Sequence, residues 1–501
     1  MIREKGQKLI FVGSNMLYGN KNLFYLGKAL LQSKWLIVAA LTSIFVLLLP
    51  SPGPAEFGGV SIVLTPQGQA MLALLAGLII VFLTEALPIG GLVGIVYAWV
   101  VFFKVLDGKE AAAIFSHEAV WFLIGALMMA QVVIKHNLHK RILIWLFGMV
   151  GTKTRNLVIA LIAFCAISAA FIAEHLIVAM MLPIVLAIIA AVGGVKDNPR
   201  LTKLLLFSIA FGATIGSLAT PSGGGRNVIA IGLIEEFSGI SVGYGSWMLM
   251  AFPLTIVLIP ILAFILLKTW KPEIPDLKDS LIVIKKEMQM DRMGIKEWGT
   301  ALIFILVLYL WIFHSGLGIG MVALLGATLF LVFKLAEWKD YQNINWSIPM
   351  LYFGAIGLGT ALQITGAAKW LAAEILIFTE HIIPLEGFSL LVFQTAIMSF
   401  FTEVMADGPA VATIAPTLME SAALTGADVV VAGVAMAIVS AFAFILVIGT
   451  PANAIIYGTG LLRPKDFLTT GIFIKIISII LLWVLIRYWW SFLGVGVSGF
   501  H

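Results

Sequence analysis

The chain has 501 residues, of which 61% are hydrophobic and only 11% are charged. Its mean hydropathy of +1.07 excludes an ordinary soluble domain, in which about 25% of residues are charged, because too much apolar surface would stay in water. The net charge of +5 does not indicate a nucleic-acid partner, since most basic residues lie in short connections between apolar runs. The chain is therefore predicted to be an all-α polytopic membrane protein.

The first half begins with a basic segment, residues 1–34, which we expect on the cytoplasmic side or at the interface. The first half proper, residues 35–268, contains apolar runs that predict transmembrane helices near 35–50, 69–87, 88–105, 118–134, 203–235 and 246–268. The only cysteine, Cys165, lies in an apolar run, so an internal disulfide and a cysteine metal cluster are excluded.

A charged stretch, residues 269–297, is predicted to be a cytoplasmic linker to the second half, residues 298–501. Further transmembrane helices are expected near 298–315, 318–334, 348–376, 430–461 and 467–494. The two halves together make about eleven spans.

Two other apolar stretches, 156–194 and 386–424, are interrupted in the middle by polar residues. Basic residues flank both ends of the first stretch and neither end of the second. Since Lys and Arg favour the cytoplasmic side, we predict two re-entrant helical hairpins, one entering from the cytoplasm and one from outside. This pattern puts the N-terminus in the cytoplasm and the C-terminus outside, in a cell or bacterial inner membrane.

The two halves repeat a pattern of polar residues. When the hairpins are aligned on Pro183 and Pro416, each has an acid nine residues earlier, Glu174 and Asp407. After each hairpin comes an apolar segment broken by Thr-Pro and Asn, within 203–235 and again within 430–461. Helix breaks at membrane depth are tolerated where they line a cavity or lie within protein. Paired breaks in two halves indicate the binding site of a transporter built from inverted repeats.

The motifs HNLHKRILIWL (136–146), AAFIAEHLIVAMMLP (169–183), MSFFTEVMADG (398–408) and GTPANAIIYGTG (449–460) carry a family resemblance. Over roughly 118–490 the chain resembles the divalent-anion:sodium symporter family of dicarboxylate, citrate and sulfate carriers, within the ion-transporter superfamily. The resemblance implies a homodimer with a scaffold domain and an elevator-type transport domain. It also implies two sodium ions at the hairpin tips, beside a substrate carboxylate.

The chain departs from this family at both tips, where Ser-Asn-Thr is replaced by Ala173-Glu174-His175 and by Ala406-Asp407-Gly408. In the first broken helix Arg226 stands where the family has proline. Ionisable groups at membrane depth usually face a cavity and pair with one another. We expect Arg226 to lie by Glu174 and to supply the charge of the first sodium ion, a guanidinium being permanently charged.

The resulting candidate substrate-binding residues come from both tips and both broken helices: Glu174, His175, Gly223, Gly224, Arg226, Asn227, Asp407, Gly408, Thr450, Pro451 and Asn453. The resemblance suggests a sodium site at Thr402, Ala406, Asp407 and Thr450. No other cofactor is expected, and Asp407 could instead carry a proton.

The leading hypothesis is a secondary transporter of a small carboxylate, sulfonate or sulfate-like anion with altered cation coupling, in contact with the lipid bilayer. A cation/proton antiporter that uses Glu174 and Asp407 is the alternative, although Arg226 would repel a cation. An intramembrane enzyme is disfavoured because the chain contains no HExxH motif, P-loop or partnered nucleophile motif. A channel is disfavoured because paired inverted repeats favour alternating access.

Overall fold

The computed structural model describes residues 34–114, 117–277, 292–380 and 387–495. The first half comprises a helix over Lys34–Leu48, strands β1 (Ala55–Phe57) and β2 (Val60–Ile62), and helices α2 (Pro66–Thr84), α3 (Leu92–Phe102), α4 (Gly108–Ala113), α5 (Glu118–Lys135), α6 (Leu138–Val150), α7 (Thr154–Ala169), α8 (Glu174–Ala191), α9 (Pro199–Ser217), α10 (Gly225–Ser238) and α11 (Tyr244–Thr269). Most of the predicted basic N-terminal segment, 1–33, lies outside the described residues, as does the end of the chain at 496–501.

The second half comprises helices α13 (Ile295–Phe313), α14 (Ile319–Val332), α15 (Trp338–Gln342), α16 (Ser347–Ile364), α17 (Ala367–Glu380), α18 (Gly387–Val404), α19 (Asp407–Leu424), α20 (Val429–Ser440), α21 (Pro451–Tyr457) and α22 (Pro464–Val484), which continues as a π-helical turn, Leu485–Trp490. Part of the predicted linker, 278–291, lies outside the described residues.

The helical fold is as predicted, with one addition. Strands β1 and β2 form a small antiparallel sheet in which Ala55 pairs with Ile62, so the chain is mostly rather than entirely helical. Among the described residues, eight helices are long and apolar enough to cross a bilayer. The two halves of each broken helix are separate helices, so this number does not test the eleven predicted spans.

Two details of the predicted helices were wrong. The run 348–376 is two helices, because Gly366 has a φ of +69° and ends the helical path after α16. Helix α6 lies between the span predicted near 118–134 and the stretch 156–194, where no helix was predicted, and it starts after Asn137 in the left-handed region. The break predicted within 430–461 is present, since α20 ends at Ser440 and α21 begins at Pro451.

Close helix packing depends on small residues. A Cβ added at Gly125 of α5 would lie 2.6 Å from the Cβ of Ala323 on α14, and one at Gly216 of α9 would lie 2.1 Å from the carbonyl oxygen of Ala166 on α7. These glycines therefore let the paired backbones approach, as is common between membrane helices.

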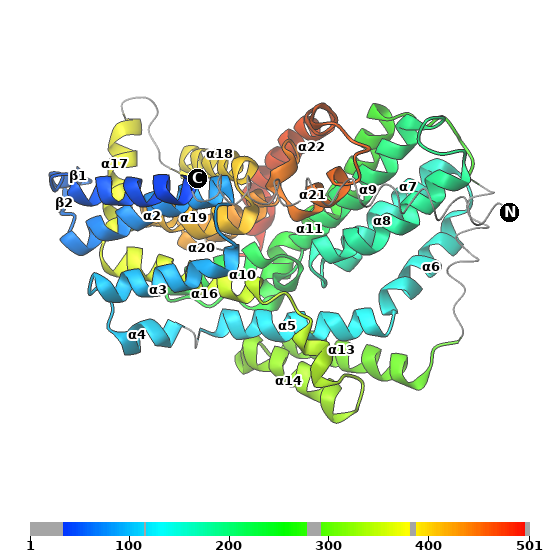
Figure 1. Cartoon of the computed structure of the whole chain (residues 1–501), viewed down its shortest axis with the longest axis horizontal. Coiled ribbons are helices and arrows are strands. Elements are labelled where there is room, and N and C mark those ends of the chain that lie inside the picture. Colours follow the sequence, from blue (N-terminus) through cyan, green and yellow to red (C-terminus); the bar gives the residue numbers. More distant parts are fainter. Residues whose placement is uncertain (1–33, 115–116, 278–291, 381–386, 496–501) are drawn as a thin grey trace, which may run out of the picture.

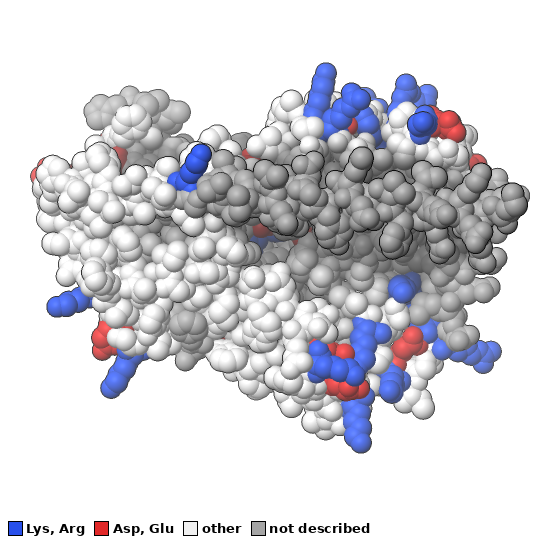
Figure 2. Space-filling view, in the orientation of Figure 1, with Lys and Arg blue, Asp and Glu red and all other residues white. Residues whose placement is uncertain are grey.

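The two halves exchange contacts around the centre of the molecule. Helix α10 of the first half packs against α19 and α20 of the second, while α21 of the second half packs against α8 and α9 of the first (Figure 1). Lys and Arg side chains gather mainly towards the right-hand end of the face in Figure 2, and its described middle is largely uncharged. The central polar residues described next are therefore enclosed by apolar helices.

Candidate functional site

The starts of two helices carry the predicted acids. Glu174 is the first residue of α8, and Asp407 is the first residue of α19. A carboxylate at a helix N-terminus is stabilised by the free N–H groups and the positive end of the helix dipole. The Gly408 N–H indeed donates to Oδ1 of Asp407 at 2.7 Å. Asp407 thus occupies the start of α19, which could otherwise bind an anion.

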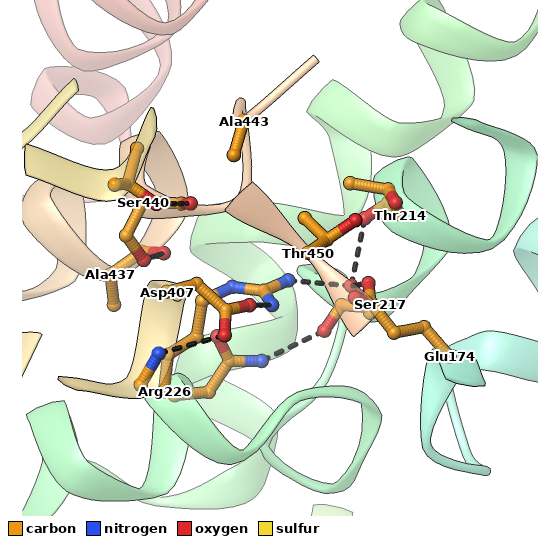
Figure 3. Close-up of polar contacts among 12 residues, drawn as sticks. Glu174, Thr214, Ser217, Arg226, Asp407, Ala437, Ser440, Ala443 and Thr450 are labelled. Carbon is orange, nitrogen blue, oxygen red and sulfur yellow. Dashed lines mark hydrogen bonds and ion pairs between the residues drawn. The ribbon is translucent and has the colours of Figure 1, made fainter. Parts of the chain in front are cut away.

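Arg226 joins the two acids. Its Nη1 is ion-paired with Oδ2 of Asp407, and its Nη2 donates to Oγ of Ser217 at 2.5 Å. The Ser217 hydroxyl lies 2.9 Å from Oε2 of Glu174, and Figure 3 shows the resulting row of four side chains. The row connects the turn between α7 and α8 with the turn between α18 and α19.

The expected partner of Arg226 was wrong. Among the described residues, the acid paired with the guanidinium is Asp407, and Glu174 is reached only through Ser217. The side chain of Arg226 is 1% exposed and that of Asp407 is 15% exposed. The pair is thus almost completely shielded from water. In such a buried site a charge without a partner would be strongly disfavoured.

The breaks in the two broken helices are stabilised by the same pattern of hydrogen bonds. The side-chain amide of Asn227 donates to the carbonyls of Ser217 and Thr220, ten and seven residues earlier. The amide of Asn453 donates to the carbonyls of Ala443 and Leu446, again ten and seven residues earlier. In both halves an asparagine thus satisfies carbonyls that the helix break leaves without a partner.

Each broken segment is also tied to the helical hairpin of its own half. The Thr220 hydroxyl donates to the carbonyl of Ala170, at the turn before α8. In the second half the Glu403 carboxylate accepts from the backbone N–H groups of Ile445 and Leu446. Lys475 of α22 neutralises that buried carboxylate at 2.7 Å. Hairpin and broken helix are therefore linked in both halves by different chemistry.

The glycines of the first broken turn face protein atoms in this conformation. A Cβ at Gly223 would lie 2.6 Å from the Ser217 carbonyl oxygen, and one at Gly224 would lie 3.1 Å from Cζ of Arg226. A side chain at Gly223 would therefore collide with backbone oxygens, whereas one at Gly224 would require Arg226 to shift by a few tenths of an ångström. Near Gly408 the nearest atom, on Leu351, is at an ordinary 3.5 Å.

The oxygens of the suggested sodium site already have partners. The Thr402 hydroxyl donates to the Ser440 carbonyl at 2.6 Å. The Thr450 hydroxyl accepts from the Asn453 N–H and caps α21, which begins with Pro451. Asp407, which follows Ala406, is bound by Arg226. Sodium binding at these residues remains a prediction.

His175 is partly buried beside Glu174, and the described part of the chain gives its ring no hydrogen bond.

Two neighbours were missed by the sequence analysis. Ser217 links Arg226 with Glu174, but a serine in an apolar helix usually bonds only its own helix backbone. Tyr352 of α16 reaches the start of α10, where a Cβ at Gly225 would lie 1.2 Å from its hydroxyl oxygen. No local sequence signal distinguished either residue.

Comparison with known proteins identifies related sequences. The family described as the sodium:sulfate symporter transmembrane region matches residues 28–495. A sodium-dependent dicarboxylate transporter from Staphylococcus saprophyticus is 24% identical in an alignment that covers 87% of this chain and 89% of that protein. One from Staphylococcus aureus strain USA300 is 22% identical, with 84% and 86% covered.

Two solved structures have a similar fold. MtrF of Neisseria gonorrhoeae, described within a class of antimetabolite efflux pumps, superposes with a TM-score of 0.54 at 12% identity, covering 94% of this chain and 96% of MtrF. The YdaH transporter of Alcanivorax borkumensis superposes with a TM-score of 0.53 at 10% identity, covering 94% and 99%. At these identities the likeness concerns the fold alone.

Proposed function

Because this chain belongs to the family of the sodium:sulfate symporter transmembrane region, we propose that it is a secondary active transporter of a small carboxylate, sulfonate or sulfate-like anion. The family consists of membrane carriers, and the chain is a transporter rather than an enzyme. The observation that carries the proposal of an anionic solute is the buried guanidinium of Arg226 where the two hairpin turns meet.

Arg226 is suited to bind the anionic group of the solute. A guanidinium forms strong, directed hydrogen bonds with carboxylates and sulfate-like groups. In the described conformation Asp407 occupies that role. The solute therefore competes with Asp407 for Arg226, near the start of α10, whose N–H groups favour negative charge. The proposed binding region also includes His175, next to Glu174 at the start of α8, and the asparagines of the two broken helices, Asn227 and Asn453.

This exchange of partners supplies a reason for cation coupling. Once the solute holds Arg226, the Asp407 carboxylate loses its charge partner in a largely dry site, which is strongly unfavourable. A cation at Asp407 removes the penalty. Sodium is favoured by the sodium-dependent relatives and by the nearby Thr402 and Thr450 oxygens, and a proton is the alternative. The proposed coupling therefore differs from that of the family, because the cation is bound by the carboxylate of Asp407 where the family has an asparagine.

The transport movement is proposed to be of the elevator type. Helices α7–α10 and α18–α21 would form the moving domain, and α2, α3, α5, α14 and α16 would belong to the scaffold of a homodimer. The reciprocal packing of α10 on α19 and of α21 on α8 supports two inverted repeats with re-entrant hairpins. The proposed orientation has the N-terminus in the cytoplasm and the C-terminus outside.

The test is flux into proteoliposomes, with succinate, citrate, sulfate and taurine as probes and with sodium and pH gradients imposed separately. We expect uptake of at least one probe, accelerated by one of the two gradients. Uptake of none of them, or efflux of sodium in exchange for protons without any anion, would overturn the proposal and favour the cation/proton antiporter.

A further inference from the structure

Among the described residues, one buried carboxyl group is paired directly with no cation. Glu174 is 5% exposed, and within the described part of the chain its Oε1 atom has no hydrogen bond of normal geometry. Its Oε2 atom accepts from the Ser217 hydroxyl at 2.9 Å, and the Thr214 hydroxyl is the other donor close to the carboxyl group. A buried carboxylate normally accepts several hydrogen bonds or faces a cation directly. Around Glu174 the described residues offer only the hydroxyls of Ser217 and Thr214 as donors, and Ser217 stands between the carboxyl group and the guanidinium of Arg226.

The hydrogens around Ser217 can be counted. Three polar atoms surround its Oγ: Nη2 of Arg226 at 2.5 Å, the carbonyl oxygen of Thr214 at 2.8 Å and Oε2 of Glu174 at 2.9 Å. The guanidinium supplies one hydrogen, and the serine has a single hydrogen of its own. Two oxygen–oxygen contacts therefore share one hydrogen if Glu174 is ionised.

A proton on Glu174 satisfies all three contacts. The carboxylic acid then donates to Ser217 Oγ, Ser217 donates to the Thr214 carbonyl, and Arg226 donates to Ser217 Oγ. Without that proton, one contact at hydrogen-bond distance joins two oxygens with no hydrogen between them, which is repulsive. The geometry thus matches the neutral acid.

The charges nearby lead to the same result. The titratable groups that face Glu174 are Arg226 on α10 and Asp407 on α19, together with its neighbour His175 on α8. The basic residues of the adjoining helices α7 and α9 lie near the N-terminal ends of those helices. Glu174 lies near their C-terminal ends, so these basic residues are far from it. Arg226 and Asp407 neutralise each other. An ionised Glu174 would add an uncompensated negative charge, and a protonated one leaves the group neutral.

We propose that Glu174 binds a proton in this conformation and that this proton is a coupling ion of transport. The second half of the proposal rests on the proposed anion transport. An anion on Arg226 places negative charge beside Glu174 and so strengthens proton binding there. By linkage, the proton strengthens anion binding to the same degree. The proton leaves when the turn before α8 opens to water, which can solvate the carboxylate. Anion and proton therefore move in the same direction.

The proton itself is measured by infrared difference spectroscopy of the full chain in lipid at neutral pH. We expect the carbonyl band of a protonated carboxylic acid that shifts when glutamate, but not aspartate, is isotopically labelled. Glu174→Gln should lose this band. The matched control is Glu403→Gln, since the Glu403 carboxyl group is also buried but accepts from Lys475 and from two backbone N–H groups. A band that persists in Glu174→Gln, or no glutamate band in the wild type, overturns the proposal. Labelling keeps this test valid if the variant does not fold.

Coupling is measured with a pH-sensitive dye inside proteoliposomes, equal sodium on both sides and succinate or sulfate outside. The wild type should acidify the interior as the anion enters. Glu174→Gln cannot bind this proton, so any anion uptake that the variant retains should proceed without acidification of the interior. Wild-type acidification by the variant overturns the coupling role. If the wild type takes up none of the four probes named for the flux assay, the anion-transport proposal fails, and the infrared band alone decides whether Glu174 binds a proton.

Discussion

Replacing Arg226 with alanine should destabilise the protein strongly. Among the described residues, the change leaves Asp407 with the Gly408 N–H as its remaining hydrogen-bond donor, and it removes a donor from Ser217. Breaking a buried ion pair by removing one partner costs about 3–5 kcal/mol. Because the Asp407 side chain keeps 15% exposure, we expect a loss of about 3 kcal/mol, the lower end of that range.

The loss should depend on the charge that is left behind. In the double variant Arg226→Ala with Asp407→Asn no unpaired carboxylate remains, so most of the lost stability should return. The four proteins form a double-mutant cycle, whose interaction energy isolates the pair. The measurement is reversible unfolding in detergent or bicelles, followed by tryptophan fluorescence.

The matched control is Lys339→Ala, which breaks an ion pair with Glu337 whose side chains are 68% and 63% exposed. Exposed pairs of this kind contribute little to stability, so no measurable change is expected. The reasoning is refuted if Arg226→Ala is as stable as this control, or if adding Asp407→Asn lowers stability further.

Three other changes have defined outcomes. Asp407→Asn should abolish the dependence of anion flux on sodium or on pH, and unchanged dependence on both would mean that Asp407 is structural. Gly225→Ala should sharply reduce folded protein, since its Cβ would overlap the Tyr352 hydroxyl at 1.2 Å, and adding Tyr352→Ala should restore it; failure of this rescue would contradict the contact. Burial, and then repulsion by Lys140, lowers the pKa of His139 from 6.5 to about 4. The stability that its neutral ring contributes is present above pH 6.5 and is lost as the pH falls through 4, so His139→Leu should show a smaller drop in unfolding temperature on acidification than the wild type.

The membrane fold and the general place of the site were available from the sequence. Apolar runs near membrane length predicted most helices, because a chain in lipid must satisfy its backbone within helices. The proline and asparagine residues of the two broken segments predicted the helix ends at Ser217 and Ser440 only roughly, but they identified both breaks. Matched spacing placed Glu174 and Asp407 at the two hairpin turns, where the structure has them.

The partners within the site were decided by the tertiary structure. Arg226 was expected beside Glu174, yet it is paired with Asp407, 181 residues away. The distinction depends on how α10 packs against α19, and a local pattern contains no information on such packing. For the same reason the sequence could not predict that Ser217 links Glu174 with Arg226. Its hydroxyl differs from that of any other membrane serine only because folding brings Glu174 and Arg226 to either side of it. Sequence spacing determines which residues share one helix, whereas the charge balance of this site depends on contacts between helices that are far apart in the chain.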